Sequence, residues 1–400
     1  MKYLVLLGDG MSDEKLPQLG NRTPLQAART PHMDFMARHG LLGLARTVPP
    51  GLPPGSDVAN LSVFGYDPRN CYTGRSPLEA ASMGVALGPD DVAFRLNMVS
   101  LNISGAKVFM QDYSAGHITT EESRVLVEDL QKNFGEDGIE FYPGVGYRHL
   151  MVWRGGKYAL KSTPPHDITG KEVAGHLPKG DGADRLIFLM NASQMLFKDH
   201  PVNKKRVGEG KLPASSIWLW GHGKSPRIGS FKELHGLSGA VISAVDLIKG
   251  IGIYAGLDVI NVAGATGYID TNYEGKVAAA LQALETRDYV YLHVEAPDEA
   301  GHSGNLEHKM QAIEDFDARV VGPILEGVKK FDSYRILCTP DHPTPLALMT
   351  HTSNPVPFIL YAGENAENRS IEGYDEDTAA ATGLVVEEGY RLMGMLLAKQ

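Results

Sequence analysis

Short, mostly apolar runs recur toward both ends of the chain, at 3–7, 289–294, 334–339 and 357–361. Runs of this length without polar alternation are typical of strands buried on both faces, as in a parallel sheet. Helical signals lie between and after them, and the pattern predicts helices over 31–39, 272–285, 307–325 and 387–398. Residues 238–256 are also expected to form a helix, with a further strand from Asp258. This alternation predicts an α/β fold with a doubly wound, mostly parallel sheet flanked by helices.

The pattern of apolar and polar residues changes between residues 91 and 236. There the apolar runs are shorter and the polar loops between them are longer. A chain of 400 residues also exceeds what one hydrophobic core usually supports. We therefore expect two domains: residues 1–90 and 237–400 form the sheet domain, and 91–236 form a smaller inserted α+β domain.

Composition narrows the class of protein. Hydrophobic residues make up 43% and charged residues 22%, as in an ordinary globular protein. The net charge of −10 gives no reason to expect nucleic acid or an anionic membrane as a partner. The two cysteines, Cys71 and Cys338, cannot make a disulfide framework. No signal-peptide pattern or membrane span is seen, so a cytoplasmic protein is expected.

Candidate metal ligands follow the predicted strands. Asp9 follows the first, Asp298 and His302 follow the second, Asp341 and His342 follow the third, and His351 precedes the last. Each has a common structural explanation alone, such as a turn or a helix cap. Loops after parallel strands share one sheet edge, however, so these side chains can meet there.

Three carboxylates and three imidazoles exceed the needs of one ion that also binds substrate. Two ions about 4 Å apart would use them all. Oxygen and nitrogen ligands without thiolate suit Mn²⁺ or Zn²⁺, and suit Mg²⁺ or Ca²⁺ less well. Such a pair of ions is typical of phosphoryl transfer.

A candidate nucleophile, Ser56, opens a predicted helix after a stiff loop rich in proline and glycine. A helix N-terminus stabilises an alkoxide or a phosphorylated serine. On this segment alone, a plain serine N-cap is the commoner explanation. Ser62 lies well inside the same helix, where the helix terminus has little effect.

Several segments resemble the cofactor-independent phosphoglycerate mutases of the alkaline phosphatase superfamily. They are LLGDG at 6–10, PGSDVAN at 54–60, EAPDEAGH at 295–302, TPDH at 339–342 and HTSNPVPF at 351–358. The segment AGATGYIDTN at 263–272 is closer to the archaeal-type branch. The resemblance runs along nearly the whole chain. It implies an alkaline-phosphatase-like sheet domain that carries an inserted substrate-binding domain.

The resemblance also implies an activity: an isomerase that interconverts 3-phosphoglycerate and 2-phosphoglycerate through a phosphoserine. Ser56 matches the family's nucleophile. Asp298, His302 and His351 match the ligands of one metal ion, and the other ion would be held by Asp9, Ser56, Asp341 and His342. Mn²⁺ is the expected ion, with Co²⁺, Mg²⁺ or Zn²⁺ as variants, and no bisphosphoglycerate is expected as cofactor. The expected partner is a small phosphorylated substrate; the oligomeric state is left open.

Candidate substrate-binding residues in the inserted domain match the family's pattern less closely than the metal ligands do. Arg95, His117 and Arg148 are expected to bind substrate, and Asp167 is expected to act as the base. The bacterial branch has a histidine-rich loop where this chain has QDYSAGH at 111–117, and paired arginines where this chain has only Arg95. A phosphomonoesterase, a phosphotransferase acting on another alcohol, and a metal-binding protein without activity therefore remain as alternatives.

Overall fold

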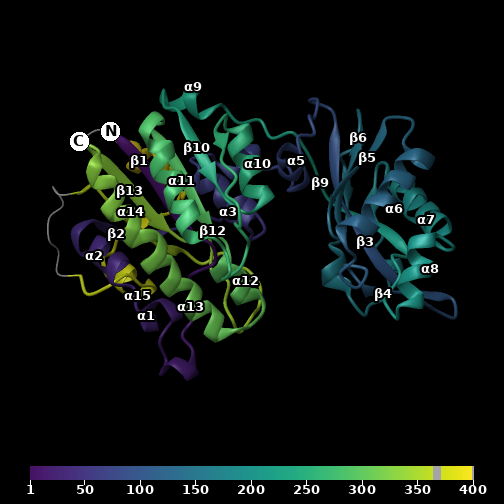
Figure 1. The fold of residues 1–400 in the computed structure, drawn as a ribbon, viewed down its shortest axis with the longest axis horizontal. Coiled ribbons are helices and arrows are strands. Elements are labelled where there is room, and N and C mark those ends of the chain that lie inside the picture. The colour runs from purple at the N-terminus through teal and green to yellow at the C-terminus, as the bar shows by residue number, and fades with distance from the viewer. Residues whose placement is uncertain (364–370, 399–400) are drawn as a thin grey trace. The chain divides into compact units, whose positions relative to one another are not determined.

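The computed structural model describes residues 1–363 and 371–398 and divides into two compact units. The first unit contains Met1–Tyr72 and Arg227–Gln400, and the second contains Thr73–Pro226 (Figure 1). Within the described residues, no helix is both long and apolar enough to cross a membrane. Each unit is considered by itself below.

The first unit is built on an eight-stranded sheet in the order β11-β10-β12-β1-β13-β14-β2-β15. Its strands are β1 (Lys2–Gly8), β2 (Leu41–Ala45), β10 (Gly239–Ile242), β11 (Asp258–Val259), β12 (Tyr289–Val294), β13 (Tyr334–Thr339), β14 (Val356–Tyr361) and β15 (Val385–Val386). The pairings are parallel except for the two that β14 makes with its neighbours β13 and β2. Strand β1 is central, and six of its seven residues are buried, as its apolar run predicts.

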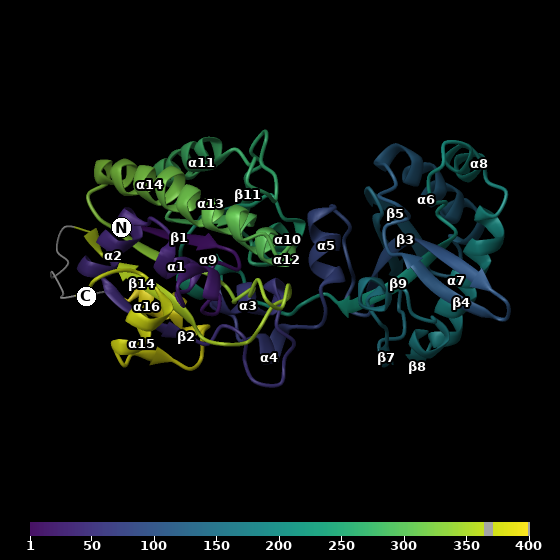
Figure 2. The ribbon, with the colours of Figure 1, turned by 90° about the horizontal axis from the view of Figure 1, so that it is seen from below.

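Helices cover the sheet of the first unit (Figure 2). They are α1 (Pro24–Ala27), α2 (Pro31–His39), α3 (Ser56–Val63), α4 (Pro68–Cys71), α9 (Phe231–His235), α10 (Asp246–Tyr254), α11 (Tyr273–Thr286), α12 (Ala296–His302), α13 (Leu306–Phe316), α14 (Gly322–Gly327), α15 (Glu376–Ala381) and α16 (Arg391–Leu397). A π-helical turn, Asp317–Val321, joins α13 to α14. The largest core lies between the sheet and the apolar faces of α2, α11, α13 and α14. Helices α10 and α16 both contact α3, which carries Ser56.

The second unit contains a five-stranded sheet in which β3 is central. Its strands are β3 (Val92–Ser104), β4 (Lys107–Asp112), β5 (Ile139–Val145), β6 (Arg148–Trp153) and β9 (Ser216–Lys224), and β7 (Leu160–Lys161) pairs separately with β8 (Lys179–Gly180). Its helices are α5 (Ser76–Ser82), α6 (Thr120–Phe134), α7 (Ala183–Phe197) and α8 (Pro201–Gly208). The α6 and α7 helices pack on one face of the sheet and enclose a separate hydrophobic core.

The structure confirms the expected fold class. The continuous helix expected over 238–256 is wrong: its first part is strand β10, buried beside β12, and α10 begins only at Asp246. A short apolar run cannot be assigned to strand or helix by periodicity alone. The expected helix 307–325 is interrupted by the π-helical turn, and the expected C-terminal helix begins later, at Arg391.

The boundaries between the two units lie at 72/73 and 226/227, and not at the expected 90/91 and 236/237. Residues 73–90 lie in the second unit, because helix α5 packs on β3 and β9. Residues 227–236, which include helix α9, lie in the first unit. Helices at such junctions carry no sequence signal for the sheet they cover.

Candidate functional site

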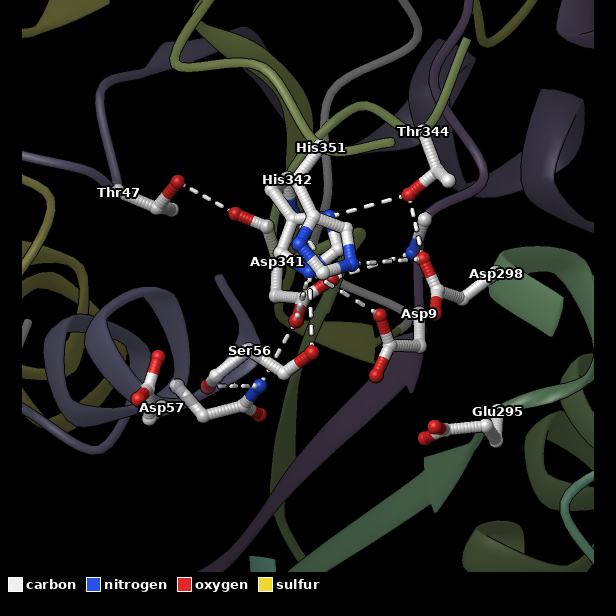
Figure 3. Close-up of polar contacts among 12 residues, drawn as sticks. Asp9, Thr47, Ser56, Asp57, Glu295, Asp298, Asp341, His342, Thr344 and His351 are labelled. Carbon is white, nitrogen blue, oxygen red and sulfur yellow. Dashed lines mark hydrogen bonds and ion pairs between the residues drawn. The ribbon is translucent and has the colours of Figure 1, made fainter. Parts of the chain in front are cut away.

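Loops from one edge of the large sheet bring the expected ligands of the first unit together (Figure 3). Asp9 follows β1, Asp298 lies in α12 just after β12, and Asp341 follows β13. His351 precedes β14, and because β14 runs antiparallel to its neighbours, its entry loop reaches the same edge. The reversal of this one strand explains how a residue before a strand joins residues that follow strands.

Asp9, Asp341 and His342 form a completely buried cluster. The Nε2 atom of His342 lies 3.5 Å from Asp9 Oδ1 and 3.3 Å from Asp341 Oδ2. Asp341 Oδ1 accepts hydrogen bonds from the backbone amides of Gly10 and His342. Burial, and then the charges of neighbouring carboxylates such as Asp341, raise the pKa of Asp9 well above its ordinary value. Carboxylates packed this closely call for a compensating positive charge.

Ser56 is the first residue of helix α3 and faces this cluster. Its Oγ lies 3.1 Å from His342 Nε2. Asn60, one turn further along α3, donates from Nδ2 to the Ser56 carbonyl and to Asp341 Oδ2. Ser62 points elsewhere, because its hydroxyl donates to the backbone carbonyl of Thr47. The structure therefore places Ser56, and not Ser62, at the cluster.

A second cluster contains Asp298, His302 and His351. The Nε2 atoms of the two histidines lie 2.8 Å apart, and they lie 3.3 Å and 3.5 Å from the two Asp298 oxygens. Burial alone would raise the pKa of Asp298, but the hydrogen bonds from the two histidines hold it well below its ordinary value. His302 Nδ1 donates to the Met349 carbonyl, so Nε2 is the ring nitrogen that faces Asp298 and His351. Two imidazole nitrogens and a carboxylate that converge in this way are typical metal-ligand geometry once the nitrogens have lost their protons.

His293 and Glu295 extend the first cluster, and the sequence reasoning missed both. His293 Nε2 lies 2.8 Å from Asp9 Oδ2 and 3.6 Å from Glu295 Oε2. Burial, followed by the charge of Asp298, raises the pKa of Glu295 to about 8. The available signal was a histidine inside the otherwise apolar strand β12. Among the described residues, Asp9, His293 and Glu295 form one group whose ligand atoms could hold a cation. Two further groups of this kind both contain His342, one with Asp9 and Asp341 and the other with Asp298 and His351.

The candidates of the second unit lie among aromatic rings on its sheet. Arg95 on β3 is 6% exposed; its Nη1 donates to Glu79 Oε1 at 3.0 Å, and its guanidinium lies 4.9 Å from the Trp220 ring centroid. Arg148 is exposed and lies over the Tyr147 ring, which His117 also contacts edge-on.

Asp167 is an exposed residue of a short 3₁₀ helix, Pro165–Ile168. Its Oδ1 lies 3.7 Å from Nε2 of the neighbouring His166. The ring of His166 contacts Trp220 and Tyr113, and Tyr113 contacts Tyr147. A chain of ring contacts therefore connects the surroundings of Arg95 with those of His117, Arg148 and Asp167.

Glu79 is a counter-ion that the sequence reasoning did not assign. Its Oε1 also accepts from Arg75 Nε at 3.1 Å, so one carboxylate oxygen serves two guanidinium groups. Burial, followed by the charges of Arg75 and Arg148, lowers the pKa of Arg95 to about 10 despite the opposing effect of Glu79. The buried Nε of Arg95 has no hydrogen-bond partner among the described residues. Three arginines around one carboxylate give this part of the unit an excess of positive charge, which favours the binding of an anion.

Comparison with known proteins adds independent findings. Residues 37–203 match a family model described as 2,3-bisphosphoglycerate-independent phosphoglycerate mutase. A Geobacter sulfurreducens protein named a probable mutase of this kind is 70% identical and is matched over 99% of this chain and 100% of its own length. A Methanosarcina acetivorans protein named 2,3-bisphosphoglycerate-independent phosphoglycerate mutase is 55% identical, again over 99% of this chain and 100% of its own length.

Solved structures agree with the sequence relatives. A Pyrococcus horikoshii structure, 30% identical, superposes with a TM-score of 0.84 over 100% of this chain and 98% of its own. The cofactor-independent phosphoglycerate mutase from Thermoplasma acidophilum, 28% identical, gives 0.64 over 99% of both chains. With relatives of this identity matched from end to end, the chain belongs to the 2,3-bisphosphoglycerate-independent phosphoglycerate mutase family.

Proposed function

We propose that this chain interconverts 3-phosphoglycerate and 2-phosphoglycerate, with Ser56 as the transient carrier of the phosphoryl group. The observation that carries the proposal is the position of Ser56 Oγ. It lies at the N-terminus of α3 and 3.1 Å from His342 Nε2, within a buried cluster of carboxylates and imidazoles. The names of the end-to-end relatives support the same reaction.

The donor set fits divalent metal ions. All candidate ligands offer oxygen or nitrogen, and Asp9 Oδ1 is a buried atom without a hydrogen-bond partner among the described residues. In our proposal one ion is held by Asp298, His302 and His351, and the other by Asp9, Ser56, Asp341 and His342. Mn²⁺ is our first choice, and Co²⁺, Mg²⁺ or Zn²⁺ would suit the same donors. When bound, the ions would acidify the serine hydroxyl and offset phosphoryl charge.

Each step of the proposed reaction is assigned to residues of the chain. Ser56 Oγ attacks phosphorus in line, so that a P–O bond to serine forms as the bond to the substrate oxygen breaks. Amide groups at the N-terminus of α3 favour the resulting phosphoserine. Glycerate stays bound, and its other hydroxyl attacks phosphorus and releases Ser56. Asp167 is our candidate for the base that accepts the proton of that hydroxyl.

Substrate binding is proposed for the arginine-rich part of the second unit. Arg95 and Arg148 would hold carboxylate or phosphate, since a guanidinium pairs with either in bidentate fashion. His117 would add a further hydrogen bond. Support comes from the unpartnered Arg95 Nε and from the single carboxylate, Glu79, shared by two of the arginines.

The proposal is tested by a coupled assay with Mn²⁺ and 3-phosphoglycerate, without bisphosphoglycerate. We expect 2-phosphoglycerate to form without release of free phosphate, and Ser56→Ala to lower the rate by at least about 1,000-fold, since an alanine side chain cannot accept the phosphoryl group. Ser62→Ala is the matched control: it removes a buried hydroxyl from the same helix and should keep most of the activity.

Other outcomes have distinct meanings. Release of phosphate alone would make the protein a phosphomonoesterase. Full activity in Ser56→Ala would remove the proposed nucleophile. No reaction of phosphoglycerate with the metal-loaded protein would overturn the proposed substrate and leave a phosphotransferase for another alcohol as the next reaction to test.

A further inference from the structure

Thr344 is a completely buried residue two positions after His342. Its backbone amide donates to the Ser12 carbonyl at 3.1 Å, and its own carbonyl accepts from the buried ammonium of Lys309 at 2.7 Å. The chain also makes room for it, because a Cβ on Gly10 would lie 2.6 Å from Thr344 Oγ1. The position of Thr344 is therefore set by its backbone and its packing, independently of its hydroxyl.

The Thr344 hydroxyl contacts one member of each ligand cluster (Figure 3). Its Oγ1 is hydrogen-bonded to Asp298 Oδ1 and lies 3.2 Å from His342 Nδ1. Asp298 belongs to the cluster with His302 and His351, whereas His342 belongs to the cluster with Asp9 and Asp341. A single oxygen atom thus connects the two clusters.

The direction of these hydrogen bonds follows from the available protons. An ionised carboxylate only accepts, so the single hydroxyl proton of Thr344 goes to Asp298. The Thr344 oxygen must then accept from His342 Nδ1, which places the imidazole proton on Nδ1. The Nε2 atom of His342 is left with a lone pair, directed at the Ser56 hydroxyl 3.1 Å away. A metal-ligating histidine needs this tautomer.

We propose that Thr344 is a positioning residue that couples the two metal sites, an inference that rests on the ligand assignment in the proposed function. Its hydroxyl fixes the rotation of the Asp298 carboxylate for one ion and the tautomer of His342 for the other. Loss of the hydroxyl disturbs both sites together, although Thr344 is not one of the proposed ligands. Mutation of a residue that is hydrogen-bonded to a metal ligand typically weakens metal binding by about 10- to 100-fold.

The test is the binding of Mn²⁺ to metal-free protein, measured by calorimetry without substrate. Wild type should bind two ions, and Thr344→Val should bind both about 10- to 100-fold more weakly, whereas Thr344→Ser should resemble wild type. Thr339→Val is the matched control, because Thr339 is equally buried on β13 and its hydroxyl donates to backbone carbonyls, those of Pro340 and Pro357. Wild-type affinity in Thr344→Val would overturn the inference while leaving the proposed function intact. Failure of the wild type to bind two ions would overturn both.

A second measurement needs no variant at position 344 and so does not depend on its folding. Long-range ¹H–¹⁵N correlation on the metal-free protein, with His342 assigned by the His342→Gln spectrum, reports which ring nitrogen carries the proton. We expect the proton on Nδ1. A proton on Nε2 would contradict the hydrogen-bond order on which the coupling depends.

Discussion

Residues of the same type in this chain are distinguished by what surrounds them. Ser56 and Ser62 lie on one helix, but only Ser56 faces the carboxylate and imidazole cluster. Arg95 and Arg319 are both paired with a glutamate, but the Arg95 side chain is 8% exposed and the Arg319 side chain 38%. Because burial decides how strongly a charge depends on its partner, these two arginines should respond differently when the partner is removed.

Replacement of Glu79 by Gln should be strongly destabilising, because it leaves the buried Arg95 guanidinium without its counter-charge. We expect the free energy of unfolding to fall by about 3 kcal/mol in chemical denaturation. Glu274→Gln is the control: it breaks the more exposed pair with Arg319 and should cost less than about 1 kcal/mol. Addition of Arg95→Met to Glu79→Gln should recover stability. Equal costs for Glu79→Gln and Glu274→Gln would show that Arg95 does not depend on Glu79.

At the scale of elements, a side chain of helix α15 joins segments from the opposite end of the chain. Glu376 accepts from the Asp13 amide, in the loop after β1, and from Thr23 Oγ1, the N-cap of α1. Both contacts lie in the first unit and both use oxygen atoms of one carboxyl group. Burial raises the pKa of Glu376 to about 7, because it disfavours the charged carboxylate.

This raised pKa predicts a pH dependence of stability. Between the ordinary value of 4.5 and about 7, the folded protein holds a proton on Glu376 that the unfolded chain has lost, so stability should fall as pH rises through this window. The effect of this group should reach at most about 3 kcal/mol. Glu376→Gln mimics the protonated form, and its denaturation midpoint should depend less on pH than that of wild type. Parallel pH profiles of the two proteins would exclude Glu376 as the source.

At the scale of the whole molecule, the candidate metal ligands all lie in the first unit. Asp9, Asp298 and Asp341 are buried there within a few ångströms of histidine nitrogens. The described part of the second unit contains no comparable group of ligand atoms. The two units also have separate hydrophobic cores.

Removal of metal should therefore destabilise the two units unequally. An ion present at 100 times its dissociation constant stabilises the folded state that binds it by about 2.7 kcal/mol. With a chelator, we expect faster amide hydrogen exchange in β1, β12 and β13, and little change in β3, β6 and β9. Mass spectrometry of peptides from both sheets measures this. Equal acceleration in both sheets, or none in β1, would contradict a metal centre confined to the first unit.

The sequence by itself determined the fold class and the group of residues at the sheet edge. Buried parallel strands carry local signals, and their carboxyl ends must meet at one edge, so Asp9, Asp298 and Asp341 could be brought together without coordinates. The start of a predicted helix made Ser56 a candidate nucleophile, the family resemblance favoured it over Ser62, and the structure places its Oγ 3.1 Å from His342 Nε2.

Only the tertiary structure decided which neighbours serve these residues. The antiparallel direction of β14 delivers His351, the hydroxyl of Thr344 joins Asp298 to His342, and His293 orients Asp9. In the second unit it paired Arg95 with Glu79 and Trp220. Most of these contacts join residues far apart in the chain, and all depend on how elements pack and on which way side chains point. Periodicity and capping signals act within a few residues, so no local pattern specifies such contacts.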